Sequence, residues 1–181
     1  VIAGGTKTGI PGIVGSIAAK QKAAPGGRNY DLIAYRPKNL PDNAPLDERY
    51  DDHIKTQGEG FSPLEPLASW ADILSAGIEP RSVRVLGISG GPISAFEYHL
   101  ALALGAAVGI VEGSGRKAVD LVGAAHDWPR SHLIQLPHDP MTVRAFVQGH
   151  GSRRPGLSRE QIELAGAVVH DVYGETARKK H

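Results

Sequence analysis

Glycine-rich turns occur twice directly after a short apolar run and before a segment of helical pattern, and this arrangement constrains the fold more than any other feature. The first occupies residues 1–15 (VIAGGTKTGIPGIVG) and the second residues 83–97 (VRVLGISGGPISAFE). Glycine lets backbone amides approach an anion closely, and the helix N-terminus behind the turn adds partial positive charge. Two such turns in a chain of 181 residues predict an α/β protein that binds a ligand with phosphates, such as a nucleotide derivative.

Short apolar runs alternate with helical patterns along the whole chain. The expected strands are residues 1–3, 30–35, 83–88, 107–111 and 132–136, and the expected helices are residues 12–24, 63–76, 93–104, 115–126, 140–148 and 158–178. This alternation is typical of a Rossmann-like, doubly wound parallel sheet with helices on both faces, here with about five or more strands and an extra C-terminal helix. Ligands of such sheets bind beyond the carboxyl ends of the strands.

The domain organisation follows from breaks in this rhythm. Residues 1–148 are expected to form the Rossmann-like ligand-binding domain, residues 149–157 a linker rich in Gly, Arg and Pro, and residues 158–181 the C-terminal helix. A long polar connection, residues 36–61, interrupts the alternation. Long loops in compact domains are usually functional, so we expect this one to fold over the site as a lid.

Composition excludes several classes of function. The net charge of +1 gives no reason to expect a nucleic-acid partner, and there is no apolar run long enough to span a membrane. The absence of cysteine excludes disulfides and thiolate chemistry and is consistent with a cytoplasmic protein. The eight histidines show no zinc spacing, and the Asp-Asp-His cluster at residues 51–53 is expected to be a solvated loop, so no metal site is predicted.

The first turn departs from two familiar phosphate-binding motifs. Gly4 and Gly9 have the separation of a Walker A loop, but Ile and Pro at residues 10–11 stand where that loop requires Lys and Ser or Thr. Gly9, Gly12 and Gly15 give the spacing G-x-x-G-x-x-G, which is not the common dinucleotide fingerprint.

The end of the second expected strand also differs from that fingerprint. Tyr35 and Arg36 stand where a dinucleotide fold places the acidic residue that holds a ribose. Thr and Lys side chains in the first turn supply hydroxyls and one cation for a phosphate, although a tight turn without a ligand would have the same glycines. The candidate ligand-binding residues of this turn are Gly4, Gly5, Thr6, Lys7, Thr8 and Gly9.

The second turn is compatible with two kinds of chemistry. Residues 87–91 (GISGG) match the G-x-S-x-G nucleophile elbow, which would make Ser89 the nucleophile of a serine hydrolase. No His-Gly oxyanion motif lies upstream and the chain is short for that fold, so the hydrolase ranks last among the alternatives.

The same stretch also has the spacing G-G-x-x-S-x-x-E, which ends at Glu97. Glu97 would hold ribose hydroxyls or act as a general acid/base, or it would form a capping box with Ser94. The candidate ligand-binding residues of this turn are Ser89, Gly90, Gly91, Pro92, Ile93 and Glu97.

A third glycine turn follows the strand expected at residues 107–111. Ser114, Gly115 and Arg116 open the next helical pattern, and a cation in the first turn opposes the helix dipole. That placement indicates contact with an anion, although a solvated arginine on an ordinary loop remains the alternative.

Taken together, four blocks of the chain resemble the SLOG superfamily. They are Gly4-Gly5-Thr6-x-x-Gly9-x-x-Gly12, the segment from Gly90-Gly91 to Glu97, residues 101–106 and residues 113–118. The superfamily includes the lysine-decarboxylase-like LOG phosphoribohydrolases, DprA-type DNA-processing proteins and the N-terminal cytosolic domains of melastatin-type TRP (TRPM) channels. The likeness covers residues 1–125 and is strongest to the bacterial, channel-type branch, while residues 161–173 resemble the first helix of a ryanodine-receptor-type (RyR) domain.

The resemblance implies a pocket for an ADP-ribose-like nucleotide derivative, and homo-oligomers because isolated domains of this superfamily often pair. LOG enzymes carry G-G-x-G-T-x-x-E, whereas this chain has Ile93 and Ser94 at the third glycine and the threonine, and it lacks a clear equivalent of their arginine pair. The leading expectation is therefore a non-catalytic sensor that relays ligand binding to the C-terminal helix. The alternative is a phosphoribohydrolase that cleaves the N-glycosidic bond of a nucleoside monophosphate with Glu97 as acid/base.

Overall fold

The computed structural model describes residues 1–115 and 132–149. The chain divides into two compact units, Val1–Trp70 and a second that begins at Ala71. Apart from Gly115 and Gly149, the helix expected at 115–126, the linker and the C-terminal helix with its RyR-like sequence lie outside the described residues.

The first unit contains three parallel strands in the order β1-β2-β3. The strands are β1 (Ile2–Ala3), β2 (Ile33–Arg36) and β3 (Asp52–Lys55), and the helices are α1 (Gly9–Ala23), between β1 and β2, and α2 (Leu64–Ser75), within which the unit ends. In the register, Ala34 pairs with Ala3 on one side and with His53 on the other.

One face of this sheet packs against α1. Leu32 and Ala34 are fully buried there together with Ala18 of α1, and Tyr50, which precedes β3, completes the cluster. Ala34 and Arg36 of β2 alternate with Leu32, the residue before the strand, and the three therefore point to the same side of the sheet. This side carries the residues that matter for the candidate site.

The second unit repeats the design with the order β4-β5-β6. Its strands are β4 (Arg84–Gly87), β5 (Ala107–Val111) and β6 (Leu133–Leu136), all parallel, and its elements also include the 3-10 turn η1 (Pro80–Ser82), α3 (Pro92–Ala103) and α5 (Pro140–Val147). Every residue of β5 is buried, as expected for a central strand covered on both faces.

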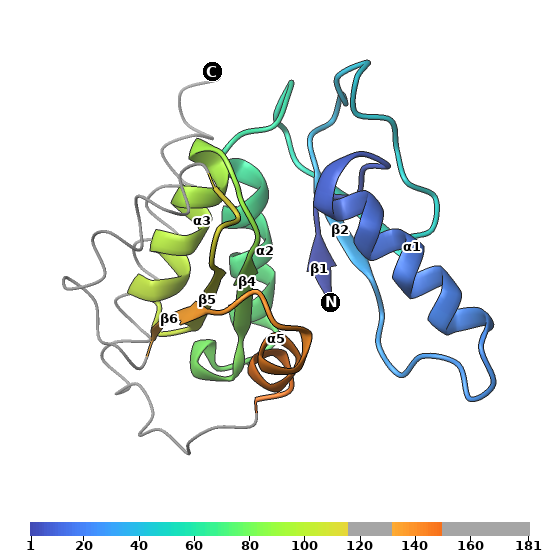
Figure 1. The fold of residues 1–181 in the computed structure, drawn as a ribbon. Helices are drawn as coiled ribbons and strands as arrows, with labels where there is room; N and C mark the ends of the chain where they lie inside the picture. Colours follow the sequence, from blue (N-terminus) through green and yellow to red (C-terminus); the bar gives the residue numbers. More distant parts are fainter. Residues whose placement is uncertain (116–131, 150–181) are drawn as a thin grey trace. The chain divides into compact units, whose positions relative to one another are not determined.

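Helices α3 and α5 cover opposite faces of this second sheet (Figure 1). A Cβ added to Gly87 would meet Tyr98 of α3, whereas one added to Gly109 would meet Phe146 of α5 at 2.8 Å. Gly87 pairs with Ile110, the residue after Gly109, so the two glycines face opposite sides. The close approach of both helices depends on these two positions having no side chain.

The expected α/β class with parallel strands and alternating helices is confirmed. The prediction of one continuous sheet of about five or more strands was wrong. The six strands of the described residues form two three-stranded parallel sheets, in the orders β1-β2-β3 and β4-β5-β6. No helix within the described part of the chain is long and apolar enough to cross a membrane.

Candidate functional site

The first glycine turn leaves the carboxyl end of β1 and enters α1. Gly5 has φ 70° and Gly9 has φ 62°, and a Cβ on Gly5 would lie 2.5 Å from the Cβ of Ala34 and 3.4 Å from Nδ1 of His53. Both the backbone conformation and the space therefore require glycine at position 5. The turn lies directly on the sheet face that carries Ala34 and His53.

Residues 45–47 pair with this turn. The Lys7 amide donates to the Pro45 carbonyl and the Asp47 amide donates to the Gly5 carbonyl, each at 2.9 Å, and Thr6 forms an antiparallel bridge with Leu46. The long connection expected at residues 36–61 thus covers the glycine turn. It is not a continuous loop, however, because β3 interrupts it.

Two glycines of the G-x-x-G-x-x-G spacing are explained by packing. A Cβ on Gly12 would overlap the Lys7 carbonyl group, and one on Gly15 would overlap the Asp47 carboxylate and lie 3.3 Å from the Tyr50 ring. The Tyr50 hydroxyl donates to the Pro11 carbonyl at 3.0 Å. Gly12 and Gly15 therefore let the turn and residues 45–50 lie against α1, a role that the sequence pattern did not reveal.

The Asp47 side chain is fully buried and paired with Arg49. Its Oδ1 accepts from Arg49 Nε at 2.7 Å and its Oδ2 from Arg49 Nη2 at 2.6 Å, while Nη2 also donates to the Gly12 carbonyl at 3.0 Å. The hydrogen bonds from the Arg49 side chain lower the pKa of Asp47. This fork links the connection after β2 to the first turns of α1.

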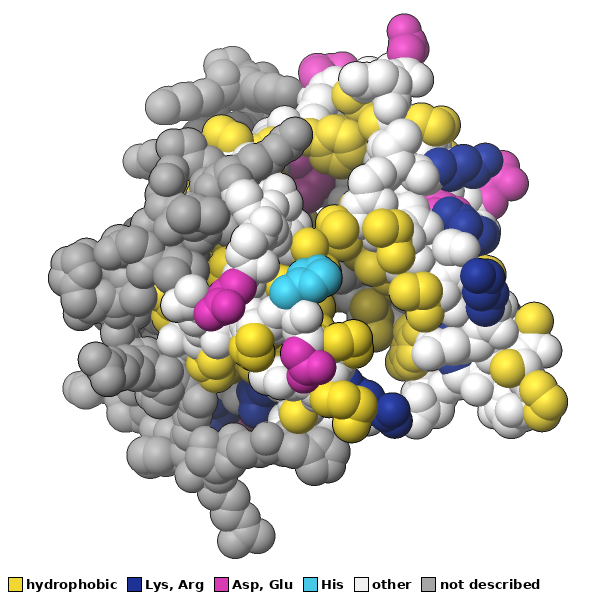
Figure 2. All heavy atoms as spheres, viewed as in Figure 1, with side chains coloured by type: hydrophobic (Ala, Val, Ile, Leu, Met, Phe, Trp, Pro, Cys, Tyr) yellow, Lys and Arg dark blue, Asp and Glu magenta, His cyan; other side chains and the backbone are white. Residues whose placement is uncertain are grey.

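The N-terminus of α1 is exposed beside this packing. Thr8 is the N-cap but makes no side-chain cap, the first turn contains no acidic residue, and Gly9 and Ile10 are exposed. Exposed basic side chains are visible on the part of this unit that holds α1 (Figure 2), and Lys7, just before the N-cap, is exposed. Uncapped amides, a helix dipole and a nearby cation are the groups that attract a phosphate.

Two functional candidates that the sequence interpretation missed lie at the carboxyl end of the same sheet. Arg36 ends β2 and His53 lies within β3; the Nε of Arg36 and both ring nitrogens of His53 are buried without a hydrogen-bond partner among the described residues. The expectation that residues 51–53 form a solvated loop was wrong for residues 52 and 53, which belong to β3. The only sequence signal was the missing acidic residue at the end of β2.

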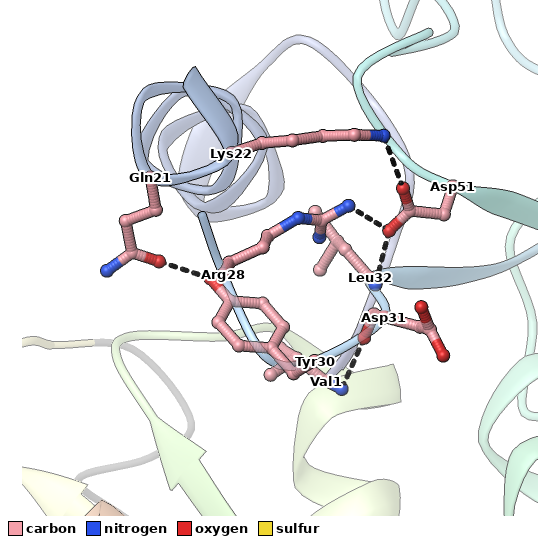
Figure 3. A network of polar contacts seen from close by, with 8 residues as sticks. All are labelled: Val1, Gln21, Lys22, Arg28, Tyr30, Asp31, Leu32 and Asp51. Carbon is pink, nitrogen blue, oxygen red and sulfur yellow. Dashed lines mark hydrogen bonds and ion pairs between the residues drawn. The ribbon is translucent and has the colours of Figure 1, made fainter. Parts of the chain in front are cut away.

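Asp51 has a structural role at the opposite, amino end of the strands (Figure 3). Its carboxylate accepts from the Leu32 amide at 2.8 Å, from Arg28, and from Lys22 at 3.1 Å. The Leu32 amide and Arg28 hold the pKa of Asp51 well below its usual range. Residues 1–115 and 132–149 contain no group of three or more His, Cys, Asp or Glu side chains that could hold a metal ion.

The second glycine turn connects β4 to α3. Ser89 has φ 60° and Gly90 has φ 125°, and a Cβ on Gly90 would overlap Ser94 at 2.6 Å. The Tyr98 hydroxyl donates to the Ser89 carbonyl at 3.1 Å and fixes the turn. Ser89 has the strained backbone that a nucleophile elbow uses. Two glycines separate it from the start of α3, whereas in an elbow the serine itself forms the strand-to-helix turn.

The start of α3 offers fewer amides than expected. Gly91 is the N-cap and Pro92 the first helical residue, so the sequence alternative of a Ser94–Glu97 capping box was wrong. Pro92 has no N–H. Of the residues expected to bind phosphate here, Gly90, Gly91 and Ile93 can donate a backbone hydrogen bond.

Glu97 lies in the second turn of α3, behind this glycine turn. Burial raises the pKa of its carboxyl group. Burial and the neighbouring Glu97 charge raise the pKa of Tyr98 to about 12. A carboxylic acid with a raised pKa keeps its proton closer to neutral pH, which is the property of a general acid.

We expect Glu97→Gln to melt at a higher temperature than the wild type at neutral pH. The folded-state pKa of Glu97 lies above its ordinary 4.5, so the native protein loses stability as pH rises through the interval between these two values. Below the ordinary value both states are protonated, and the difference between variant and wild type should disappear. Thermal melts across this pH range measure the difference in melting temperature, with Glu112→Gln as control. A difference that persists in acid would contradict the raised pKa of Glu97 as its cause.

The third turn follows β5. Gly113 and Gly115 have φ 68° and 77°, and the Ser114 hydroxyl donates to the Val111 carbonyl at 2.6 Å. The hydroxyl of Ser114 is thus hydrogen-bonded within its own turn. The third turn lies beside the turn that follows β4, because β4 pairs with β5. Arg116 lies outside the described residues, so its contact with an anion stays a prediction.

The expected site residues fall into two groups. The residues from Gly4 to Gly9 belong to the first unit, and those from Ser89 to Glu97, with Ser114 and Gly115, belong to the second. Within each unit, the structure brings them to the carboxyl edge of a parallel sheet, where ligands of such sheets bind.

Comparisons of the sequence with protein-family models and with curated proteins find no match. The resemblance to the SLOG superfamily and to RyR-type domains therefore stays a prediction that rests on the motifs themselves.

Proposed function

We propose that this protein binds a nucleotide-derived ligand, of the ADP-ribose type, without turning it over, at the carboxyl ends of its parallel strands. The observation that carries the proposal is the N-terminus of α1. Gly9 and Ile10, exposed residues at the start of α1, follow a glycine turn, and no acidic residue in the first turn competes for an anion there. The backbone hydrogen bonds to residues 45–47 hold this turn in place without a ligand.

A thermal-shift screen of the chain with AMP, ADP, ADP-ribose, NAD and cyclic dinucleotides tests the proposal. A ligand at about 100 times its Kd stabilises the native state by about 2.7 kcal/mol. We expect a clear shift with at least one compound that is recovered intact. The absence of any shift, confirmed by calorimetry with the same compounds, would contradict the proposal.

Lys7→Gln is expected to weaken the affinity for that compound about tenfold, because a charge-assisted contact to phosphate is lost. Lys20→Gln is the matched control, since Lys20 is an exposed lysine in the last turn of α1, the helix that follows Lys7. Isothermal titration calorimetry of both variants makes the comparison. Equal losses in the two variants would indicate non-specific charge attraction, and unchanged affinity in Lys7→Gln would remove Lys7 from the site.

A phosphoribohydrolase is the second candidate, and the raised pKa of Glu97 is the observation that favours it. In that case Glu97 would protonate the leaving base, and the wild type would release the base and ribose phosphate from a nucleoside monophosphate. Chromatography of the reaction mixture decides between the candidates. Release by the wild type but not by Glu97→Gln would establish the enzyme and overturn the non-catalytic proposal.

A further inference from the structure

The carboxyl edge of the first sheet holds polar groups whose hydrogen-bonding capacity is unused. Of the four buried side-chain nitrogens without a partner in the described residues, one belongs to Arg36 and two belong to His53. In the register of β2 and β3, Arg36 pairs with Lys55 and Ala34 with His53. All four side chains therefore point to the side of the sheet on which the Gly5 turn lies.

Burying these nitrogen atoms without hydrogen-bond partners lowers the stability of the folded state. The Arg36 guanidinium is always charged; its Nη1 donates to the Pro37 carbonyl at 3.3 Å, whereas its buried Nε has no partner in the described part of the chain. A buried donor without an acceptor costs about 1–3 kcal/mol, and more when it is charged. Such groups in a native structure indicate an acceptor that the chain itself does not supply.

The acidic side chains of the neighbouring loops do not supply it. Glu59 accepts from the Asn39 amide at 2.7 Å, and Glu65 accepts from Thr56 and from the Ser62 amide. Within residues 1–115 and 132–149, the cations at this edge form no salt bridge. These cations are Lys7, Arg36, Lys38 and Lys55. These four cations are therefore available to an anionic ligand.

The position of Arg36 identifies the group that would neutralise it. In a β-α-β unit that binds a nucleotide, the end of the second strand lies beside the ribose; an acidic residue there binds free ribose hydroxyls, and an arginine accommodates a phosphate on the sugar. Here β1, α1 and β2 form such a unit, and Arg36 is its last strand residue. A guanidinium also suits phosphate geometrically, because its parallel N–H groups bind two oxygens.

We propose that Arg36 and His53, which lie on neighbouring strands and on the same side of the sheet, bind a phosphate on the sugar of the ligand, so that the first unit selects sugar-phosphorylated nucleotides over those with free ribose hydroxyls. The inference rests on the proposed function and adds the class of ligand. Lys7 and the α1 amides hold the phosphate attached at the 5′ position, and Arg36 holds the additional one.

Matched ligand pairs test this selectivity. The affinities of the 181-residue chain for NADP and NAD, and for adenosine 2′,5′-bisphosphate and 5′-AMP, are measured by titration calorimetry. We expect the phosphorylated member of each pair to bind at least tenfold more tightly. Arg36→Gln should bring the two members to equal affinity, and His53→Gln should reduce the preference. Lys20→Gln should retain it.

The possible outcomes distinguish failure of the sugar-phosphate site from failure of the proposed nucleotide binding. Equal affinities within both pairs would overturn the sugar-phosphate site and leave the nucleotide-binding proposal intact. Absence of binding by all four compounds would also overturn the sugar-phosphate site, and the thermal-shift screen with ADP, ADP-ribose and cyclic dinucleotides would then decide the nucleotide-binding proposal. A preference that survives in Arg36→Gln would assign the phosphate to another residue. If Arg36→Gln does not fold by circular dichroism, Arg36→Lys serves instead. This variant keeps the charge but loses the planar fork, and the inference then requires a smaller preference than in the wild type.

Discussion

Replacing Gly12 by alanine is expected to lower the free energy of unfolding of the first unit by about 1–3 kcal/mol. In an ordinary helix the same change stabilises by roughly 0.8–1 kcal/mol, because alanine is the better helix former. Here the added Cβ would overlap the Lys7 carbonyl group, and backbone cannot yield as a flexible side chain can. The clash outweighs the propensity gain and displaces the glycine turn.

Urea denaturation followed by circular dichroism measures this change, and calorimetry with the ligand identified in the screen measures its effect on the site. Ile17→Ala is the control, because Ile17 lies on the same helix and is 50% exposed. It should change stability by no more than about 0.5 kcal/mol. A Gly12→Ala variant that is as stable as the wild type would contradict the packing role assigned to this glycine.

Removing the Asp47 carboxylate is expected to destabilise the protein by about 1–3 kcal/mol, because charge-assisted hydrogen bonds in a buried setting are lost. Asp47→Ala deprives Arg49 of its Oδ1 and Oδ2 acceptors and frees residues 45–47 from α1. Hydrogen exchange of the Lys7 amide, which donates to Pro45, should become faster in this variant. Asp42→Ala is the matched control, since Asp42 is an exposed carboxylate in the same connection.

The Asp47 carboxylate also makes the stability of the protein depend on pH, with stability decreasing in acid. The folded-state pKa of Asp47 is lowered from 3.8, so its contribution is complete above that pH and is lost as pH falls through the lower folded-state value. Acid should therefore destabilise the wild type more than Asp47→Ala. Parallel unfolding curves of the two proteins between neutral and strongly acidic pH would show that Asp47 is not the titrating group.

The strands that the sequence predicts correctly are those with apolar runs. The strand expected at residues 107–111 coincides with β5, and that expected at 132–136 differs from β6 by one residue. Strand β3 was missed because its sequence, Asp-His-Ile-Lys, contains a single apolar side chain. Its place in the sheet follows from pairing with β2 and from the packing of Tyr50, contacts between residues that periodicity does not report.

The candidate site, too, could be predicted from the sequence only in part. Glycine density identifies both turns, because positive φ and close approach are local requirements of the chain. It does not distinguish a glycine that admits a ligand from one that admits another segment, as Gly12 and Gly15 do. Arg36 and His53 become candidates through the environment of their nitrogen atoms, which depends on the assembled sheet.

The contact between residues 45–50 and the start of α1 also has a kinetic consequence. Arg49 and the Gly12 carbonyl are 37 residues apart in the chain, so this contact closes a long loop and requires β1, α1 and β2 to be in place first. The first turn and helix are local structures that form early. We therefore expect the contact that holds the glycine turn to form after the turn and helix themselves, so that a newly made chain would gain its full affinity for a ligand only when the first unit is complete.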